Sequence, residues 1–186
     1  MVGEVSIARA ATINGWMNIG ELYWLATHAK DAKIVVEAGC LYGRSTRALC
    51  DNTDGFVHAV DPWNGNYGRN ISKDGTFYTY LTVGSNAIFN QFLTNMADHL
   101  SSGKCMIHIM EFHECSVKGQ PDMIFIDANH DYENVKHDIK HALSMMSHGL
   151  LCGHDFNSNW PGVVEAVTEE FRTGFGVHES IWYVTL

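Results

Sequence analysis

Short apolar runs alternate along the chain with segments whose apolar residues recur every three to four positions. This alternation predicts parallel β-strands joined by helices, with helices covering both faces of one sheet. Five apolar runs predict buried strands, and a sixth at the end of the chain predicts an edge strand. These runs are residues 33–37, 55–61, 105–110, 122–127, 149–153 and 180–185.

Helical periodicity occupies the segments before and between these strands. Ser85 is a suitable N-cap for one helix, and Pro161 lies near the start of another, where proline is favoured. We therefore predict a single-domain, Rossmann-like, doubly wound α/β fold over residues 1–186, with an N-terminal helical segment over residues 1–30. The periodic segments are residues 19–26, 45–51, 88–96, 135–146 and 163–171.

Residues 62–83 interrupt the alternation. This stretch is rich in glycine and asparagine and carries several aromatic residues. A loop of this length in a compact domain is commonly a lid or a binding loop, and we predict a lid here. The alternative, that the aromatic side chains only fasten the loop to the surface, remains open.

Charge and composition narrow the class of partner. The net charge of -9 and the absence of a basic run argue against a nucleic-acid partner. No apolar stretch is long enough to span a bilayer, so we expect no membrane partner. Five cysteines without a C-x-x-C pair, and a first segment unlike a signal peptide, predict reduced thiols and a cytoplasmic protein.

The first predicted strand ends in a glycine-bearing turn. Gly39 and Gly43 are spaced Gly-x-x-x-Gly, which differs from the Gly-x-Gly-x-x-Gly turn of dinucleotide sites. Glu37 would also repel a pyrophosphate. A zwitterionic amino-acid group fits better, because Glu37 could accept from its ammonium while the turn amides bind its carboxylate.

Asp61 ends the second predicted strand, about 20 residues beyond the turn. An acidic residue at this position can bind both hydroxyls of an adenosine ribose. The alternative is that Asp61 only caps the next turn. Trp63 follows closely and could place its indole beside the adenine.

Three stretches at the ends of predicted strands form a recognisable set. They are Val-Glu-Ala-Gly-Cys-Leu-Tyr-Gly-Arg-Ser-Thr at residues 36–46, Asp-Met-Ile-Phe-Ile-Asp-Ala-Asn-His-Asp-Tyr at residues 122–132 and Gly-Leu-Leu-Cys-Gly-His-Asp-Phe at residues 149–156. They resemble the first, fourth-strand and fifth-strand motifs of class I S-adenosylmethionine-dependent methyltransferases, in particular small-molecule O-methyltransferases of antibiotic pathways. The resemblance extends in order over about residues 15–186.

The resemblance implies S-adenosylmethionine as cofactor. The first motif would surround its methionine part, Asp61 would bind its ribose, and the loop after the third strand would lie by its adenine. The predicted cofactor site comprises Glu37, Gly39, Tyr42, Gly43, Ser45, Asp61, Trp63, Glu111, Phe112 and Asp127.

Catalytic residues are expected at the ends of the fourth and fifth strands. His130, with Asp127, could act as general base on an acceptor hydroxyl, although His130 could instead cap a helix or pair with Asp155. Some relatives hold a divalent metal at these strand ends. The corresponding residues are Asp127, His154 and Asp155, with His130 as the alternative to His154 for the nitrogen ligand. Magnesium, manganese or calcium remains open as the ion.

The sequence thus predicts methyl transfer to a hydroxyl of a small-molecule acceptor. Trp16, Trp63 and Trp160 could line the acceptor pocket or serve only packing. Two alternatives remain: a domain that binds the cofactor without turnover, and a nicotinamide-dependent oxidoreductase, which the glycine turn disfavours. A homo-oligomer also remains open.

His137 and His141 flank charged residues, so we interpret them, with Asp138, as a solvated helix face.

Overall fold

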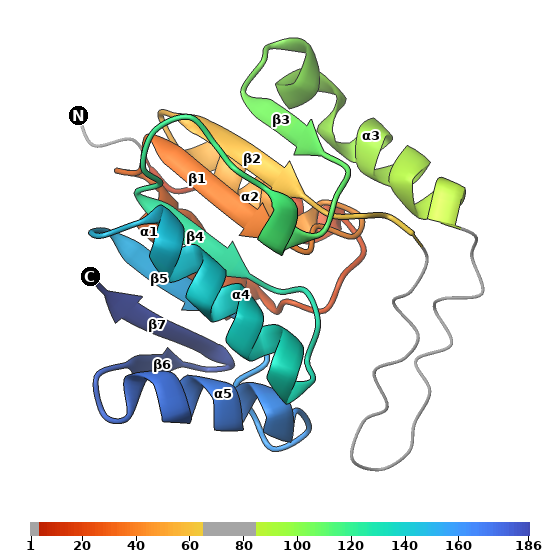
Figure 1. Cartoon of the computed structure of the whole chain (residues 1–186). Helices are drawn as coiled ribbons and strands as arrows, with labels where there is room; N and C mark the ends of the chain where they lie inside the picture. Colours follow the sequence, from red (N-terminus) through yellow and green to blue (C-terminus); the bar gives the residue numbers. More distant parts are fainter. Residues whose placement is uncertain (1–3, 65–84) are drawn as a thin grey trace.

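The computed structural model describes residues 4–64 and 85–186. It contains a seven-stranded sheet in the order β3-β2-β1-β4-β5-β7-β6, in which β1 to β5 are parallel and β7 is antiparallel to β5 and β6 (Figure 1). The predicted Rossmann-like fold is therefore confirmed. The strands are β1 Ile34–Ala38, β2 Phe56–Val60, β3 Cys105–His108, β4 Met123–Ile126, β5 Leu150–Gly153, β6 Gly176–His178 and β7 Ile181–Thr185.

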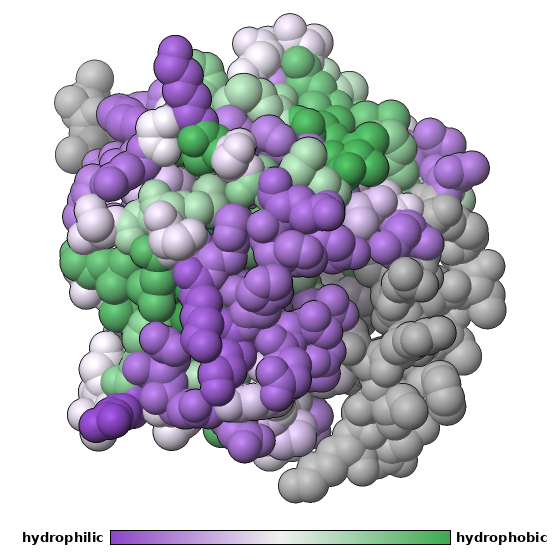
Figure 2. Space-filling view, in the orientation of Figure 1, coloured by the Kyte–Doolittle hydropathy of each residue, from purple (hydrophilic) through white to green (hydrophobic). Residues whose placement is uncertain are grey.

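Helices cover both faces of this sheet (Figure 1). On one face lie α1, α2 and α3, and on the other lie α4 and α5, whose outer surfaces are mainly hydrophilic (Figure 2). The helices are α1 Ile19–Ala29, α2 Arg44–Asn52, α3 Ser85–Ser101, α4 Tyr132–Met145 and α5 Pro161–Phe171, with short 3₁₀ turns at Ala10–Thr12 and Phe112–Glu114.

Each central strand contributes to two separate hydrophobic cores. Val35 of β1 packs with Leu49 and Phe92 on the side of α2 and α3, whereas its neighbour Val36 packs with Ile139 on the side of α4. Successive side chains of a strand point to opposite faces, so a strand covered on both faces must be apolar throughout. This is why the parallel strands are recognisable as continuous apolar runs.

The end of the chain corrects one prediction. The final strand, β7, is not an edge strand, because β6 lies outside it. Ile181 and Trp182 of β7 are fully buried, as an interior strand requires, whereas β6 is only three residues long and begins with a glycine. A run this short carries too few apolar positions for its sequence to reveal a strand.

Three other predictions concern the chain as a whole. The five cysteines all lie in the described residues and are buried and unpaired, as predicted for reduced thiols. Among the described residues, no helix combines the length and apolar character that a bilayer crossing requires. Of the predicted lid at 62–83, only Pro62, Trp63 and Asn64 are described, so the rest of that prediction lies outside the described residues.

Candidate functional site

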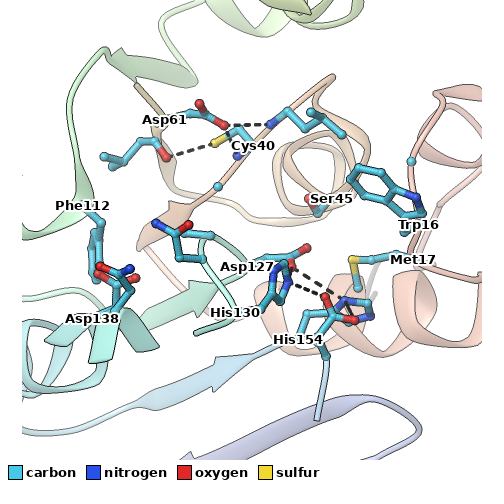
Figure 3. A pocket seen from close by; sticks show the side chains of 18 of the residues that line it. Trp16, Met17, Cys40, Ser45, Asp61, Phe112, Asp127, His130, Asp138 and His154 are labelled. Atoms are coloured by element: carbon cyan, nitrogen blue, oxygen red, sulfur yellow. Dashed lines mark hydrogen bonds and ion pairs between the residues drawn. The ribbon is translucent and has the colours of Figure 1, made fainter. Parts of the chain in front are cut away.

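A cavity of about 440 Å³ opens where the parallel strands end (Figure 3). It brings together residues that are far apart in the sequence, because the carboxyl ends of parallel strands meet at one edge of a sheet. Most of the predicted site residues line it: Gly39, Tyr42, Ser45, Asp61, Glu111, Phe112, Asp127, His130, His154 and Asp155.

The glycine turn between β1 and α2 forms one wall. Gly39 has a φ of 87°, and a Cβ at this position would lie 2.1 Å from the carbonyl oxygen of Asp127, so only glycine fits. Gly43 has the same φ and precedes the first residue of α2. The backbone amides of this turn and of the helix start therefore lie close to the cavity.

Asp61 holds this turn in place. Its Oδ2 accepts hydrogen bonds from the backbone N–H groups of Cys40 at 2.9 Å and Leu41 at 3.0 Å, and its Oδ1 accepts from that of Trp63 at 2.7 Å. The capping alternative is therefore present in the structure. Asp61 also lines the cavity, so a role toward a bound ribose stays a prediction alongside it.

Three predicted cofactor residues do not line the cavity. Gly43 lies above Phe92 and Met96 of α3. The Trp63 indole packs against Phe89 and Phe92, with ring centroids 4.9 and 4.8 Å away. The prediction that this indole lies beside an adenine is thus not supported, because the hydrophobic core holds it.

Glu37 is the third of these residues and is fully buried under the turn. Burial raises the pKa of its carboxyl, Ser45 and Thr46 lower it, and Asp127 raises it, so that the resulting pKa is about 7. A side chain with no exposed surface cannot reach an ammonium in the cavity without rearrangement. Both of its carboxyl oxygens are buried without a hydrogen-bond partner in the described residues.

A cluster of acidic and histidine side chains forms the wall at the ends of β4 and β5. His130 Nε2 lies 2.6 Å from Asp155 Oδ2, and the His130 ring stacks on Trp160 with centroids 4.3 Å apart. The predicted pairing of His130 with Asp155 is therefore present. Asp155 has a left-handed φ of 61°, an unfavourable backbone conformation of the kind that clusters at functional sites.

His154 is held between three carboxyl groups. Its Nε2 lies 3.2 Å from Glu21, while its Nδ1 lies 3.5 Å from Asp155 and 3.7 Å from Asp127. Burial alone would lower the pKa of His154, but the carboxylates of Asp127, Asp155 and Glu21 outweigh it and raise the pKa to about 11. His154 therefore places a positive charge among these acids at neutral pH.

The geometry favours one of the two predicted ligand sets for a metal ion. Asp127, His130 and Asp155 each offer one ligand atom, and these three atoms lie within 4.8 Å of one another. Of the two histidines predicted as possible nitrogen ligands, His130 belongs to this group, while Nε2 of His154 faces Glu21. Glu21 was not predicted from the sequence. The local sequence around Glu21 indicates only a helix start, because Glu21 forms a capping box with Asn18 at the beginning of α1.

The wall across the cavity is formed by the segment after β3 and by α4. Phe112 is buried and its ring meets His141 edge-on. The prediction of a solvated face on α4 is only partly confirmed. His137 is exposed, but His141 donates a hydrogen bond from Nε2 to the carbonyl of Cys115. Asp138 is buried and lines the cavity, which the alternating charges around it gave no reason to expect.

The segment before α1 closes one side of the cavity. Arg44 of α2 holds it by donating from Nε to the carbonyl of Met17 at 2.9 Å and from Nη1 to that of Ala11 at 3.1 Å. Trp16 and Met17 are thereby placed on the cavity wall (Figure 3). Trp16 and Trp160 line the cavity, as one of the two interpretations predicted, and Trp63 does not.

Solved structures share this fold at low sequence identity. Rv0187 from MTB, crystallised with its cofactor, is 14% identical with a TM-score of 0.66, covering 96% of this chain and 85% of that one. The O-methyltransferase TomG from Streptomyces achromogenes, in complex with SAM, is 12% identical (TM-score 0.61; 91% and 81% covered). An O-methyltransferase from Bacillus cereus, in complex with SAH, is 15% identical (TM-score 0.59; 95% and 86% covered).

The sequence comparison identifies the family. None of the curated proteins matches this chain in sequence. A family profile described as a methyltransferase domain matches residues 36–156, which run from the first motif through the last residue of the fifth-strand motif. This match covers more than half of the chain and includes the glycine turn, Asp61, His130 and Asp155. The chain therefore belongs to the methyltransferase domain family.

Proposed function

We propose that this protein transfers the methyl group of S-adenosylmethionine to a hydroxyl group of a small molecule. The observation that carries the proposal is that one cavity holds both the glycine turn with Asp61 and the His130–Asp155 pair. Cofactor complexes of structures with the same fold support the choice of cofactor. The net charge of -9 supports a small-molecule acceptor over a nucleic acid.

The cofactor would lie along the turn. Its amino-acid part would face the backbone amides between Gly39 and Ser45, and its ribose would face Asp61. Its sulfonium methyl would then point toward the ends of β4 and β5. Transfer requires an acceptor oxygen in line with the carbon–sulfur bond, so positioning supplies much of the rate enhancement.

His130 would remove the proton from the acceptor hydroxyl as the oxygen attacks the methyl carbon. Its Nε2 faces Asp155 and its ring stacks on Trp160. Nδ1 is buried without a hydrogen-bond partner in the described residues, so the imidazole would turn toward the cavity to take the proton. Asp155 is suited to stabilise the imidazolium that forms. Burial alone would raise the pKa of Asp155, but His130 and His154 hold it below its usual range, so the carboxyl stays ionised.

The same residues also fit a divalent cation. Two carboxylates and one imidazole, from Asp127, Asp155 and His130, form a donor set that suits manganese, zinc or iron better than magnesium or calcium. A bound cation would polarise the acceptor hydroxyl and lower its pKa. The two mechanisms give different responses to chelation, because removing a cation abolishes transfer only where the cation activates the acceptor hydroxyl.

Calorimetry with S-adenosylhomocysteine tests the cofactor, with NAD as the control ligand that we expect not to bind. Methyl transfer from labelled S-adenosylmethionine to a panel of phenols and hydroxylated small molecules then tests the activity. We expect transfer to persist in EDTA if His130 is the base, whereas loss in EDTA with recovery in manganese would assign the cation. Absence of S-adenosylhomocysteine binding would overturn the proposal.

A cytoplasmic location and a homo-oligomer stay predictions.

A further inference from the structure

Asp138 is a buried carboxyl group that the proposed reaction does not use. It lies on the second turn of α4, is 7% exposed, and lines the cavity beside Phe112 (Figure 3). Within residues 4–64 and 85–186, no group donates a hydrogen bond to it or forms an ion pair with it. Its carboxyl oxygens are not among the fully enclosed unpartnered atoms of the described residues and so open onto the cavity, where their hydrogen-bonding capacity points to a ligand.

The surroundings of Asp138 favour its neutral form. The titratable groups that face it are both acidic: Glu111 from the segment after β3 and Asp131 at the start of α4. Burial, with these two charges, raises the pKa of Asp138 to about 7. A neutral carboxyl group offers one donor and one acceptor side by side, whereas an ionised one only accepts.

The position of Asp138 in the cavity indicates which part of a ligand it would meet. Asp127, His130 and His154 lie together, while Phe112 and Asp138 form a separate wall (Figure 3). A cofactor with its ribose at Asp61 and its methyl toward His130 would direct its base to that second wall. The base is planar and neutral, and its edge carries an amino donor next to a ring-nitrogen acceptor.

We infer that Asp138 reads the adenine of the cofactor, accepting from the 6-amino group and donating to N1. This inference rests on the proposed cofactor and adds a specificity-determining residue to it. The adenine edge and a neutral carboxyl group can form two adjacent hydrogen bonds with each other. These bonds would give the Asp138 carboxyl the partners that it lacks in the described residues. A base without the 6-amino group would leave the Asp138 acceptor unsatisfied.

The test compares S-adenosylhomocysteine with its purine riboside counterpart, which lacks only the 6-amino group, by calorimetry at pH 6. We expect the wild-type protein to bind the counterpart about 10-fold to 100-fold more weakly, as loss of a hydrogen bond to a buried group predicts. Asp138→Asn, whose amide also offers a donor and an acceptor, should keep this preference, and Asp138→Leu should lose it.

Asp131→Asn is the matched control, because it removes a nearby charge outside the cavity and retains a good helix cap. It should keep the preference for adenine.

At pH 9 the wild-type protein should bind S-adenosylhomocysteine more weakly than at pH 6, because ionised Asp138 cannot donate to N1. Asp138→Asn should bind S-adenosylhomocysteine equally well at the two pH values. Equal wild-type affinities for the two ligands at pH 6 would overturn the inference even if Asp138→Leu fails to fold. Failure of the wild-type protein to bind either ligand would instead overturn the proposed cofactor.

Discussion

Asp155 and Asp138 lie on two acidic walls of the cavity, and their pKa values are shifted in opposite directions. At the ends of β4 and β5, Asp127 and Asp155 face two histidines, one of which has its pKa raised to about 11. On the wall formed by α4 and the segment after β3, Asp138 faces Glu111 without a cationic partner in the described residues, and its own pKa rises to about 7.

This difference separates two kinds of chemistry within one cavity. Asp155, which is paired with two imidazole groups, stays ionised, whereas burial raises the pKa of Asp127 beside it. A wall with such carboxyl and imidazole groups can take up or release a proton or stabilise a developing charge. A buried carboxyl without a cation lowers its energy by binding a proton, and such a wall suits a neutral ligand group. The first wall is therefore suited to the reacting atoms and the second to a part of the ligand that does not react.

The largest effect is expected at the histidine wall. His130→Ala should lower kcat for methyl transfer by about 10²-fold to 10⁴-fold, the range for loss of a general base. Its affinity for S-adenosylhomocysteine should change little, because the wall with Asp61 is untouched. Steady-state kinetics and calorimetry measure the two quantities. His137→Ala, an exposed histidine of α4, is the control, and unchanged kcat in His130→Ala would remove the base.

The next effect concerns Asp61, which lies between the two walls. Asp61→Ala should weaken S-adenosylhomocysteine binding about 10-fold or more, because hydrogen bonds to a carboxylate contribute roughly 1.5–3 kcal/mol each. It should also lower the Tm without ligand, because three backbone N–H groups lose their acceptor. Asp54→Ala changes an exposed acid and should alter neither quantity. A lowered Tm with unchanged affinity would assign Asp61 to the turn alone.

The pH dependence of stability tests the charge assigned to His154. Its pKa in the folded protein lies above its usual value, so its contribution is complete below about pH 6.5 and is lost as the pH rises toward 11. The free energy of unfolding should therefore fall between pH 7 and pH 10, by about 1 kcal/mol or more. Urea unfolding should give a flatter profile for His154→Gln. Identical profiles would mean that His154 is neutral.

The smallest effect is expected at the other wall, where the substitution should stabilise the protein. The pKa of Asp138 is raised on folding, so the wild-type protein loses stability as the pH rises from about 4 through 7. Asp138→Asn should therefore be stabilised relative to wild type at pH 8, by about 1 kcal/mol, with little difference at pH 4. A destabilised Asp138→Asn at pH 8 would show that the ionised carboxyl has a partner.

The sequence by itself determined the fold and the main positions of the site. Parallel strands buried on both faces must be continuously apolar, so β1 to β5 could be read directly, and the residues that follow them had to meet at one edge. Gly39, Asp61, Asp127, His130 and Asp155 were predicted for this reason, and all line the cavity. The exception among the strands is β6, which is too short to leave a pattern.

Only the tertiary structure decided which side chains face the cavity and which charges they meet. Glu37 and Trp63 stand in the predicted segments, yet packing under the turn and against α3 turns them away from the cavity. Glu21 reaches His154 from a helix 133 positions earlier in the chain, and Asp138 is buried on a helix whose neighbouring residues are charged. Side-chain direction and pKa depend on contacts between distant segments, because burial and charge act through space, and the order of residues does not encode those distances locally.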